Sequence, residues 1–289
     1  MKLALAAFGV TPPRDLPAFL TRIERLAAEA ALGGAALLAL PEYTAMVLAG
    51  AIIKTPDAAR ELACAVEQAE ALVAALSAIA QRHQLHLLGG TLLMRDPDGK
   101  CRNRAPLIAP SGALAWQDKQ HMTRFEAEEW GLSGGQPPKV FATALGLIGI
   151  SICYDSEFPL HVRAQATAGA KLILMPACTA DAAGFNRVRF SARARAIENQ
   201  CYTAPIPLVG QAPWSASIDS NIGHSAVFTP CDTGFPPDGV LAASPLNEPG
   251  LTFATLDFAA IETVRASGTV LNHRDWSVAI PPAPIVELT

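Results

Sequence analysis

Apolar residues recur along the chain with two different spacings, and segments of the two kinds alternate. Residues 15–31 place apolar side chains three and four positions apart, which predicts an amphipathic helix that ends at Gly33 and Gly34. Residues 35–40 form a continuous apolar run, which predicts a buried strand. Residues 1–10 are also apolar, and we interpret them as a first strand because no cleavage motif for an export signal follows.

The same alternation of helices and strands continues to about residue 205. The predicted helices cover residues 58–82, 159–168 and 187–199. The predicted strands cover residues 85–94, 145–152, 171–175 and 201–205, and residues 102–119 are predicted to form a hairpin that turns at Ser111 and Gly112. No Ser/Gly-rich or charged run divides the chain, so residues 1–289 are predicted to form one domain.

Two segments of the chain share one pattern of glycine, apolar residues and proline. GlyAlaAlaLeuLeuAlaLeuProGlu starts at Gly34, GlyAlaLysLeuIleLeuMetProAla starts at Gly169, and a predicted helix precedes each. Two helix–strand halves of this kind can pack sheet against sheet with their helices outside, which predicts a four-layer α–β–β–α sandwich of the α/β class. The copies differ where Glu42 of the first corresponds to Ala177 of the second.

Composition narrows the range of partners. The chain has 22 Lys and Arg against 26 Asp and Glu, so it lacks the basic balance typical of nucleic-acid binding. Its six Cys include no CxxC pair and no His at zinc-ligand spacing, so we expect no structural metal and no cofactor. Pro41 and Glu42 interrupt the apolar stretch 30–53, so no membrane span is expected. We therefore expect a cytoplasmic protein that acts on a small molecule.

Three reactive side chains lie where predicted strands end. Glu42 follows LeuLeuAlaLeuPro, Lys119 ends the predicted hairpin, and Cys153 follows GlyLeuIleGlyIleSerIle. A thiol can attack a carbonyl carbon, a carboxylate can move protons, and an ammonium can stabilise negative charge. Together these residues predict covalent acyl transfer without a cofactor.

Each of these residues also has an ordinary structural explanation. Most Cys are buried as small apolar side chains, most Lys are solvated, and an acid at a strand end is often a surface group. The sequence after Cys153 favours the catalytic interpretation, because a turn followed by Pro159 at a helix start would expose the sulfur. The same turn would aim backbone N–H groups, that of Tyr154 among them, at a developing oxyanion.

The motifs LeuProGluTyr, GlnAspLysGln and GlyIleSerIleCysTyrAsp, in this order, resemble the nitrilase superfamily of carbon–nitrogen hydrolases over nearly the whole chain. The resemblance implies that Glu42, Lys119 and Cys153 are catalytic. CysTyrAsp is similar to the amide-hydrolysing branches, whereas nitrile-hydrolysing members usually carry Cys-Trp-Glu. The implied activity is hydrolysis of a small amide or carbamoyl compound through a Cys thioester.

The resemblance also implies a second active-site carboxylate and an oligomer. The family often has a Glu ahead of a Trp-Gly pair, and Glu126 fits that position, with Glu128 and Glu129 as alternatives. Relatives usually pair through their outer helices, so a homodimer or higher homo-oligomer is expected.

Several alternative functions stay open on the sequence. A nitrile hydrolase, a thioester-based N-acyltransferase and a non-catalytic scaffold protein could share the fold. The stretch from Gly131 to Gly135 matches GxSxG around Ser133, but no buried strand precedes it as a serine nucleophile requires. None of the six His carries a motif that would pair it with Cys153.

If the strand ends meet, further side chains should surround the substrate. The candidates are Tyr43, Trp130, Tyr154, Cys178 and Thr179. They predict a pocket with aromatic walls and few charges, suited to a small neutral or weakly polar amide. Outside the pocket, Arg163 is expected to tie its helix to Asp155 or Glu157.

Overall fold

The computed structural model of the chain describes residues 1–276, 283 and 285. Its strands, in chain order, are β1 (Lys2–Gly9), β2 (Leu37–Leu40), β3 (His86–Gly89), β4 (Leu92–Arg95), β5 (Cys101–Ile108), β6 (Leu114–Asp118), β7 (Val140–Thr143), β8 (Gly146–Ile150), β9 (Leu172–Ala177), β10 (Tyr202–Gln211), β11 (Ser220–Asn221), β12 (Ala226–Phe228), β13 (Val240–Ala243) and β14 (Gly250–Thr255). Its helices are α1 (Leu16–Leu32), α2 (Thr44–Ala49), α3 (Ala58–His83), α4 (Arg124–Glu128), the 3₁₀ helix η1 (Cys153–Glu157), α5 (Pro159–Thr167), α6 (Ala182–Asn199), α7 (Phe258–Ser267) and α8 (Asn272–Asp275).

The strands form two halves that meet where β1 pairs with β10. The order in the first half is β4-β5-β3-β2-β1, with β6 beside β5 and β14 beside β1, and in the second half it is β10-β9-β8-β7. β1, β2 and β3 are parallel, and so are β8, β9 and β10. Parallel neighbours need crossover connections, which α1 and α3 supply in the first half and α5 and α6 in the second. The two halves therefore repeat one plan, as the paired sequence segments predict.

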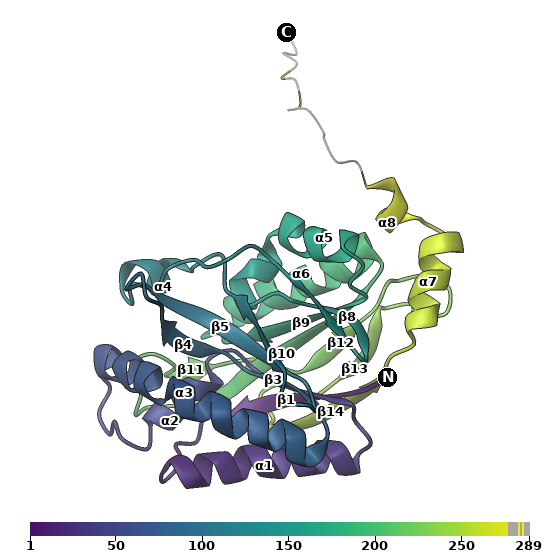
Figure 1. Ribbon diagram of the computed structural model, residues 1–289. Coiled ribbons are helices and arrows are strands. Elements are labelled where there is room, and N and C mark those ends of the chain that lie inside the picture. Colours follow the sequence, from purple (N-terminus) through teal and green to yellow (C-terminus); the bar gives the residue numbers. More distant parts are fainter. Residues whose placement is uncertain (277–282, 284, 286–289) are drawn as a thin grey trace.

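Three hydrophobic clusters separate four layers. Leu5 of β1 and Leu174 of β9 belong to the cluster between the two sheets, whereas Phe8 of β1 packs with α1 and α3. Ile173 of β9 and Ala192 of α6 belong to the third cluster, on the outer face of the second sheet. Successive side chains of one strand enter different clusters because they point to opposite faces. The layers are α1 and α3, the two sheets, and α5 and α6 (Figure 1), which confirms the predicted sandwich.

Local sequence explains where the first helix of each half begins or ends. The Asp15 side chain accepts a hydrogen bond from the backbone N–H of Ala18 at 2.8 Å and so caps α1. Gly34 and Gly169, which open the two repeated segments, have φ angles of 74° and 99°. Only glycine adopts this conformation without strain, so each turns the chain from a helix into a buried strand.

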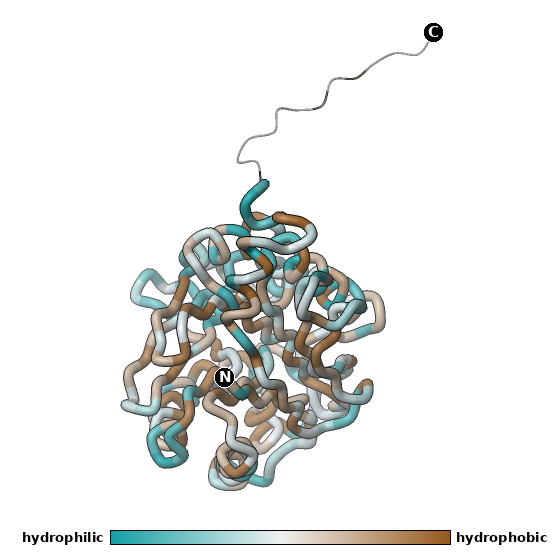
Figure 2. The backbone as a smooth tube through the Cα atoms, turned by 90° about the vertical axis from the view of Figure 1, so that its right-hand side faces the viewer, coloured by the Kyte–Doolittle hydropathy of each residue, from teal (hydrophilic) through white to brown (hydrophobic). Residues whose placement is uncertain are grey.

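The longest helix, α3, has the length and apolar composition of a possible membrane span. Its apolar stripe, which includes Leu72, Leu76 and Ile79, packs into the cluster that covers the first sheet. Figure 2 shows strongly apolar segments running through the body of the molecule, where the sheets lie. The apolar side chains of α3 thus pack against the first sheet.

Three predicted elements are wrong in extent. The strand expected over 201–205 continues to Gln211 as β10, whose later residues pair with β1 and β11. The strand expected over 85–94 is divided into β3 and β4 at Gly90, where φ is 75° and a Cβ atom would lie 2.6 Å from the Pro41 carbonyl oxygen. The helix expected over 187–199 begins earlier, at Ala182, because the Asp181 side chain caps its first turn.

The predicted partner of Arg163 is also wrong. Its Nη2 donates to the backbone carbonyl of His273 at 2.9 Å, and its guanidinium lies over the ring of Trp276. Asp155 instead accepts from the backbone of the segment after Lys119, and Glu157 contacts Arg187. Arg163 therefore anchors the segment that contains α8.

Candidate active site

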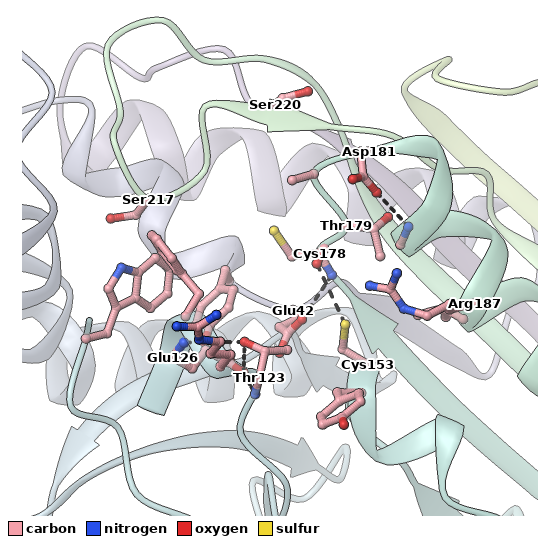
Figure 3. Close-up of a pocket in the computed structure, with 18 of the residues that line it drawn as sticks. Glu42, Thr123, Glu126, Cys153, Cys178, Thr179, Asp181, Arg187, Ser217 and Ser220 are labelled. Atoms are coloured by element: carbon pink, nitrogen blue, oxygen red, sulfur yellow. Dashed lines mark hydrogen bonds between the residues drawn. The ribbon is translucent and has the colours of Figure 1, made fainter. Parts of the chain in front are cut away.

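Three strands deliver the three predicted catalytic residues to one place. Glu42 follows β2, Lys119 follows β6, and Cys153 follows β8 by three residues. The first two come from one half of the fold and Cys153 from the other. Figure 3 shows Glu42 and Cys153 side by side at one cavity, with Cys178 above them and dashed lines from Cys178 to both.

Lys119 lies between two carboxylates in the protein interior. Its Nζ is 2.8 Å from Oε1 of Glu42, and 2.7 Å and 2.8 Å from the two oxygens of Glu126. All three side chains are at most 4% exposed. A buried ammonium needs such partners, because an isolated charge in the interior is costly.

Glu126, rather than Glu128 or Glu129, is the second carboxylate in contact with Lys119. It is the third residue of α4 and forms a capping box with Thr123, whose N–H and hydroxyl both donate to it. Glu128 is exposed and pairs with Arg124 at 2.8 Å. The pattern Thr-x-x-Glu is a recognisable helix start, and it could have distinguished Glu126 from its neighbours in the sequence.

Glu42 has two further partners that no sequence motif indicated. Nδ2 of Asn103, a buried residue of β5, donates to its Oε1 at 3.0 Å, and the backbone N–H of Cys178 donates to its Oε2 at 3.0 Å. These hydrogen bonds fix the orientation of the carboxylate. Asn103 is found only from the structure, because its place in the hairpin gives no sign of a partner in the segment that follows β2.

Cys153 stands at a sharp turn between β8 and η1. Its φ angle is 46°, a left-handed conformation that costs non-glycine residues roughly 1–3 kcal/mol. Its Sγ lies 3.7 Å from the carbonyl oxygen of Cys178, and Ser156 closes the turn with a hydrogen bond from its hydroxyl to the Cys153 carbonyl. The turn points the sulfur at the cavity while the backbone enters a helix, as the sequence predicts.

Asp155 joins this turn to the segment that carries Lys119. Its carboxylate accepts hydrogen bonds from the backbone N–H groups of Gln120 and His121 at 3.0 Å and 2.8 Å. His121 Nδ1 lies 2.8 Å from the same carboxylate. The relative positions of Lys119 and Cys153 are thus fixed by a buried polar contact between the two halves.

Burial and neighbouring charges set the protonation of the site. Burial raises the pKa of Glu42 to about 7, against the lowering effect of the Lys119 ammonium. Burial acts on Glu126 in the same direction, but the Lys119 ammonium and the hydrogen bonds from Tyr43 and Thr123 together outweigh it and lower the pKa of Glu126. Burial alone would lower the pKa of Lys119, yet Glu126 and Glu42 raise it. Burial and the charge of Glu42 raise the pKa of Cys153, so the free enzyme holds a neutral thiol.

The catalytic edge opens into a cavity of about 730 Å³. All five predicted substrate-binding residues line it: Tyr43, Trp130, Tyr154, Cys178 and Thr179. Tyr43 and Phe125 both pack edge-on against Trp130, which gives the expected aromatic wall.

The prediction that the pocket has few charges is wrong. Five charged residues line its outer part: Arg124, Glu157, Asp181, Arg187 and Asp219. They come from four separate segments that only the fold brings together, so no local pattern marked them. Ser133 of the GxSxG match is not among the lining residues, and its N–H donates to the carbonyl of Cys101.

Within the part of the chain that the structure describes, no group of three His, Cys, Asp or Glu residues is arranged to hold a metal ion.

A family model described as carbon-nitrogen hydrolase matches residues 4–266. The chain belongs to the carbon-nitrogen hydrolase family. The predicted resemblance to the amidase-like branch of the nitrilase superfamily is confirmed, and so is the prediction of an enzyme of this class.

Curated relatives include both short and long proteins. The deaminated glutathione amidase of Synechocystis sp. is 30% identical over 282 residues, which cover 93% of this carbon-nitrogen hydrolase and 97% of the relative. The omega-amidase NIT2-A of Xenopus laevis is 30% identical over 289 residues, with 94% of each chain covered. The probable hydrolase YhcX of Bacillus subtilis is 35% identical over 209 residues, but the match spans only 40% of that longer protein.

Solved structures share the fold of this carbon-nitrogen hydrolase. An amidase from Nesterenkonia sp. AN1 superposes with a TM-score of 0.73 at 27% identity, covering 96% of this chain and 100% of that one. Saccharomyces cerevisiae Nit3, a member of branch 10 of the nitrilase superfamily, also gives a TM-score of 0.73, at 25% identity, covering 96% of this chain and 97% of that one.

Proposed function

We propose that this protein is an amidase that hydrolyses a small amide through a thioester on Cys153. The observation that carries the proposal is the Lys119 ammonium held between Glu42 and Glu126 on the wall that also presents the Cys153 sulfur. A nucleophile, a carboxylate that titrates near neutrality and a buried cation are the parts that acyl transfer needs.

The first half-reaction forms the acyl-enzyme. Because the thiol is neutral, Glu42 accepts its proton as the sulfur attacks the amide carbon and the S–C bond forms. The Lys119 ammonium and the backbone N–H of Tyr154 stabilise the negative oxygen of the tetrahedral intermediate. Glu42 then gives its proton to the leaving nitrogen, the C–N bond breaks, and ammonia or an amine departs.

The second half-reaction releases the acid. Glu42, again ionised, takes a proton from water as the water oxygen attacks the thioester carbon. The S–C bond breaks and the proton returns to the thiolate of Cys153, which restores the neutral thiol. Glu126 acts through Lys119 in both steps, because its carboxylate keeps the ammonium charged and in place.

Similar proteins support this proposal. Relatives of nearly the same length carry the names deaminated glutathione amidase and omega-amidase. A mutant of the Nesterenkonia amidase carries acrylamide added at its active site cysteine. By analogy, Cys153 is the residue that would react here.

The acyl-enzyme should be detectable by mass. We expect that wild-type protein quenched during turnover of primary amides gains the mass of the acyl group, located on the peptide that contains Cys153, while ammonia accumulates. Added hydroxylamine should give the hydroxamate and relieve the adduct, because it attacks the same thioester. Ammonia release with no adduct on Cys153 under any quench would contradict the mechanism. The acyltransferase alternative would be favoured if almost no acid formed in water alone and products appeared only after hydroxylamine or an amine was added.

The pH dependence should report Glu42. Glu42 accepts a proton only when ionised, so kcat/KM should rise with pH through about 7, its raised pKa. The negative charge of Glu126 contributes to the raised pKa of Glu42. In the Glu126→Gln variant, the pH at which the remaining kcat/KM rises should therefore be lower than in wild type. A wild-type limb below pH ~5, near the ordinary carboxyl range, would contradict this role.

A further inference from the structure

One wall of the cavity belongs to a loop that is remote in sequence from every catalytic residue. The segment 212–220 leaves β10 and ends with the first residue of β11, and four of its residues line the cavity: Ala216, Ser217, Asp219 and Ser220. Figure 3 shows Ser217 and Ser220 across the cavity from Cys153. This loop, the 212–220 loop, therefore faces the part of a substrate that is farthest from the scissile bond.

A single buried carboxylate holds the loop in place. Glu61, in the first turn of α3, is 1% exposed. Its two oxygens accept hydrogen bonds from the Ser215 hydroxyl at 2.6 Å, from the Ala216 N–H at 2.8 Å and from the Ser217 N–H at 3.1 Å. Burial raises the pKa of Glu61, but the hydrogen bonds from Ser215, Ala216, Asp57 and Ser217 together outweigh it and lower the pKa, which favours the ionised carboxylate.

Hydrogen bonds within the loop and directly after it add to the contact with Glu61. The Ser215 hydroxyl oxygen also accepts from the N–H groups of Ser217 and Ile218, at 3.1 Å and 3.0 Å. Beyond the loop, Asn221 contacts the Cys178 thiol at 3.1 Å, next to the backbone groups that bind Glu42 and Cys153. The wall therefore stands at a fixed position relative to the nucleophile.

The size and chemistry of the cavity indicate what this wall binds. A volume of about 730 Å³ is within the range of sites for drug-sized ligands, far more than a two-carbon amide fills. The lining part of the loop offers the hydroxyl of Ser220 and the carboxylate of Asp219. The Ser217 hydroxyl oxygen is itself buried, so Ser217 contributes to the wall without presenting that oxygen to solvent. Such a surface suits a polar group that can donate or accept hydrogen bonds.

We propose that Glu61 is a positioning residue for substrate selection. By fixing the 212–220 loop, it sets the wall that recognises the distal, hydrogen-bonding end of an extended acyl group. Glu61 does not touch the reacting atoms, so its effect should fall on extended amides and spare short ones. This inference rests on the amidase function proposed above.

The experiment compares kcat and KM along a series of unbranched primary amides, from acetamide to six-carbon acyl chains that end in a hydroxyl or a carboxamide. Wild type should prefer the extended members. In Glu61→Gln, kcat/KM for the extended amides should fall by roughly 10-fold, mostly through KM, because hydrogen bonds to a charged group are replaced by weaker ones. For acetamide, kcat and KM should stay within about 2-fold.

Two further variants separate selection from folding. Ser215→Ala removes one donor to Glu61 and should give a smaller change in the same direction. Glu70→Gln changes an exposed carboxylate on the same helix and should leave the whole series unchanged. Hydrogen exchange of the 212–220 loop should accelerate in Glu61→Gln and not in Glu70→Gln.

The results distinguish a failure of the positioning role of Glu61 from a failure of the amidase function. If Glu61→Gln lowers kcat/KM equally for short and extended amides, or for none, the positioning role is wrong while the amidase function stands. If wild type hydrolyses no amide and forms no adduct at Cys153, the proposed function itself fails, and the positioning role with it.

Discussion

Replacing Cys153 with alanine is expected to lower kcat for amide hydrolysis by roughly 10⁴- to 10⁶-fold, since the covalent route then has no nucleophile. The side chain is small and 6% exposed, so the substitution should leave the fold intact. Ammonia release under saturating amide measures the loss, and intact mass should show no acyl adduct on the variant.

The matched control is Cys178→Ala, because Cys178 supplies a second thiol in the same cavity. Its side chain contacts Asn221, while its contacts with Glu42 and Cys153 use backbone atoms only. We expect this variant to keep hydrolysis within about 10-fold of wild type and to acylate at Cys153. A Cys178→Ala variant as inactive as Cys153→Ala, or a fully active Cys153→Ala variant, would move the nucleophile away from Cys153.

Replacing Lys119 with methionine is expected to lower the free energy of unfolding by about 3–5 kcal/mol at neutral pH. Methionine has a similar length but no charge, so Glu42 and Glu126 would face each other in the interior without a cation. Urea unfolding monitored by tryptophan fluorescence measures the change, and amide hydrolysis should be lost in the same variant.

The control for that experiment is Lys139→Met, at an exposed lysine that donates to the carbonyl of Trp116. Its effect on unfolding should stay within about 0.5 kcal/mol. The loss in Lys119→Met should shrink as pH falls from about 7, the raised pKa of Glu42, towards the ordinary carboxyl pKa of ~4.3, because protonation removes the unpaired charge. A loss that is equal for both lysines, or independent of pH, would mean that Lys119 is not the partner of these buried charges.

The parts of the site that could be predicted from sequence are those attached to strand ends. Glu42 and Cys153 follow apolar runs directly, so their local context fixes their place at an edge of the sheet before any contact is known. The repeat from Gly34 and Gly169 similarly indicates two sheets, because each copy holds the same helix-to-strand turn.

The parts that could not be predicted depend on contacts between distant segments. Glu61 and Ala216 are 155 positions apart, and nothing in the apolar periodicity of α3 distinguishes Glu61 from the solvated acids of the same helix. Asn103 is equally inconspicuous within its hairpin. The charged residues that line the outer part of the cavity were missed for the same reason. Arg187 and Glu157, for example, meet only because α6 packs beside η1.

The backbone of residue 178 has a consequence for how this enzyme can change over evolutionary time. One peptide segment there serves both Glu42, through its N–H, and Cys153, through its carbonyl, and neither contact involves the side chain. A substitution at this position therefore leaves both hydrogen-bonding backbone groups present, with the exception of proline, which lacks the N–H. Because Cys178 lines the cavity, mutation there can reshape specificity while the backbone contacts with Glu42 and Cys153 are inherited unchanged.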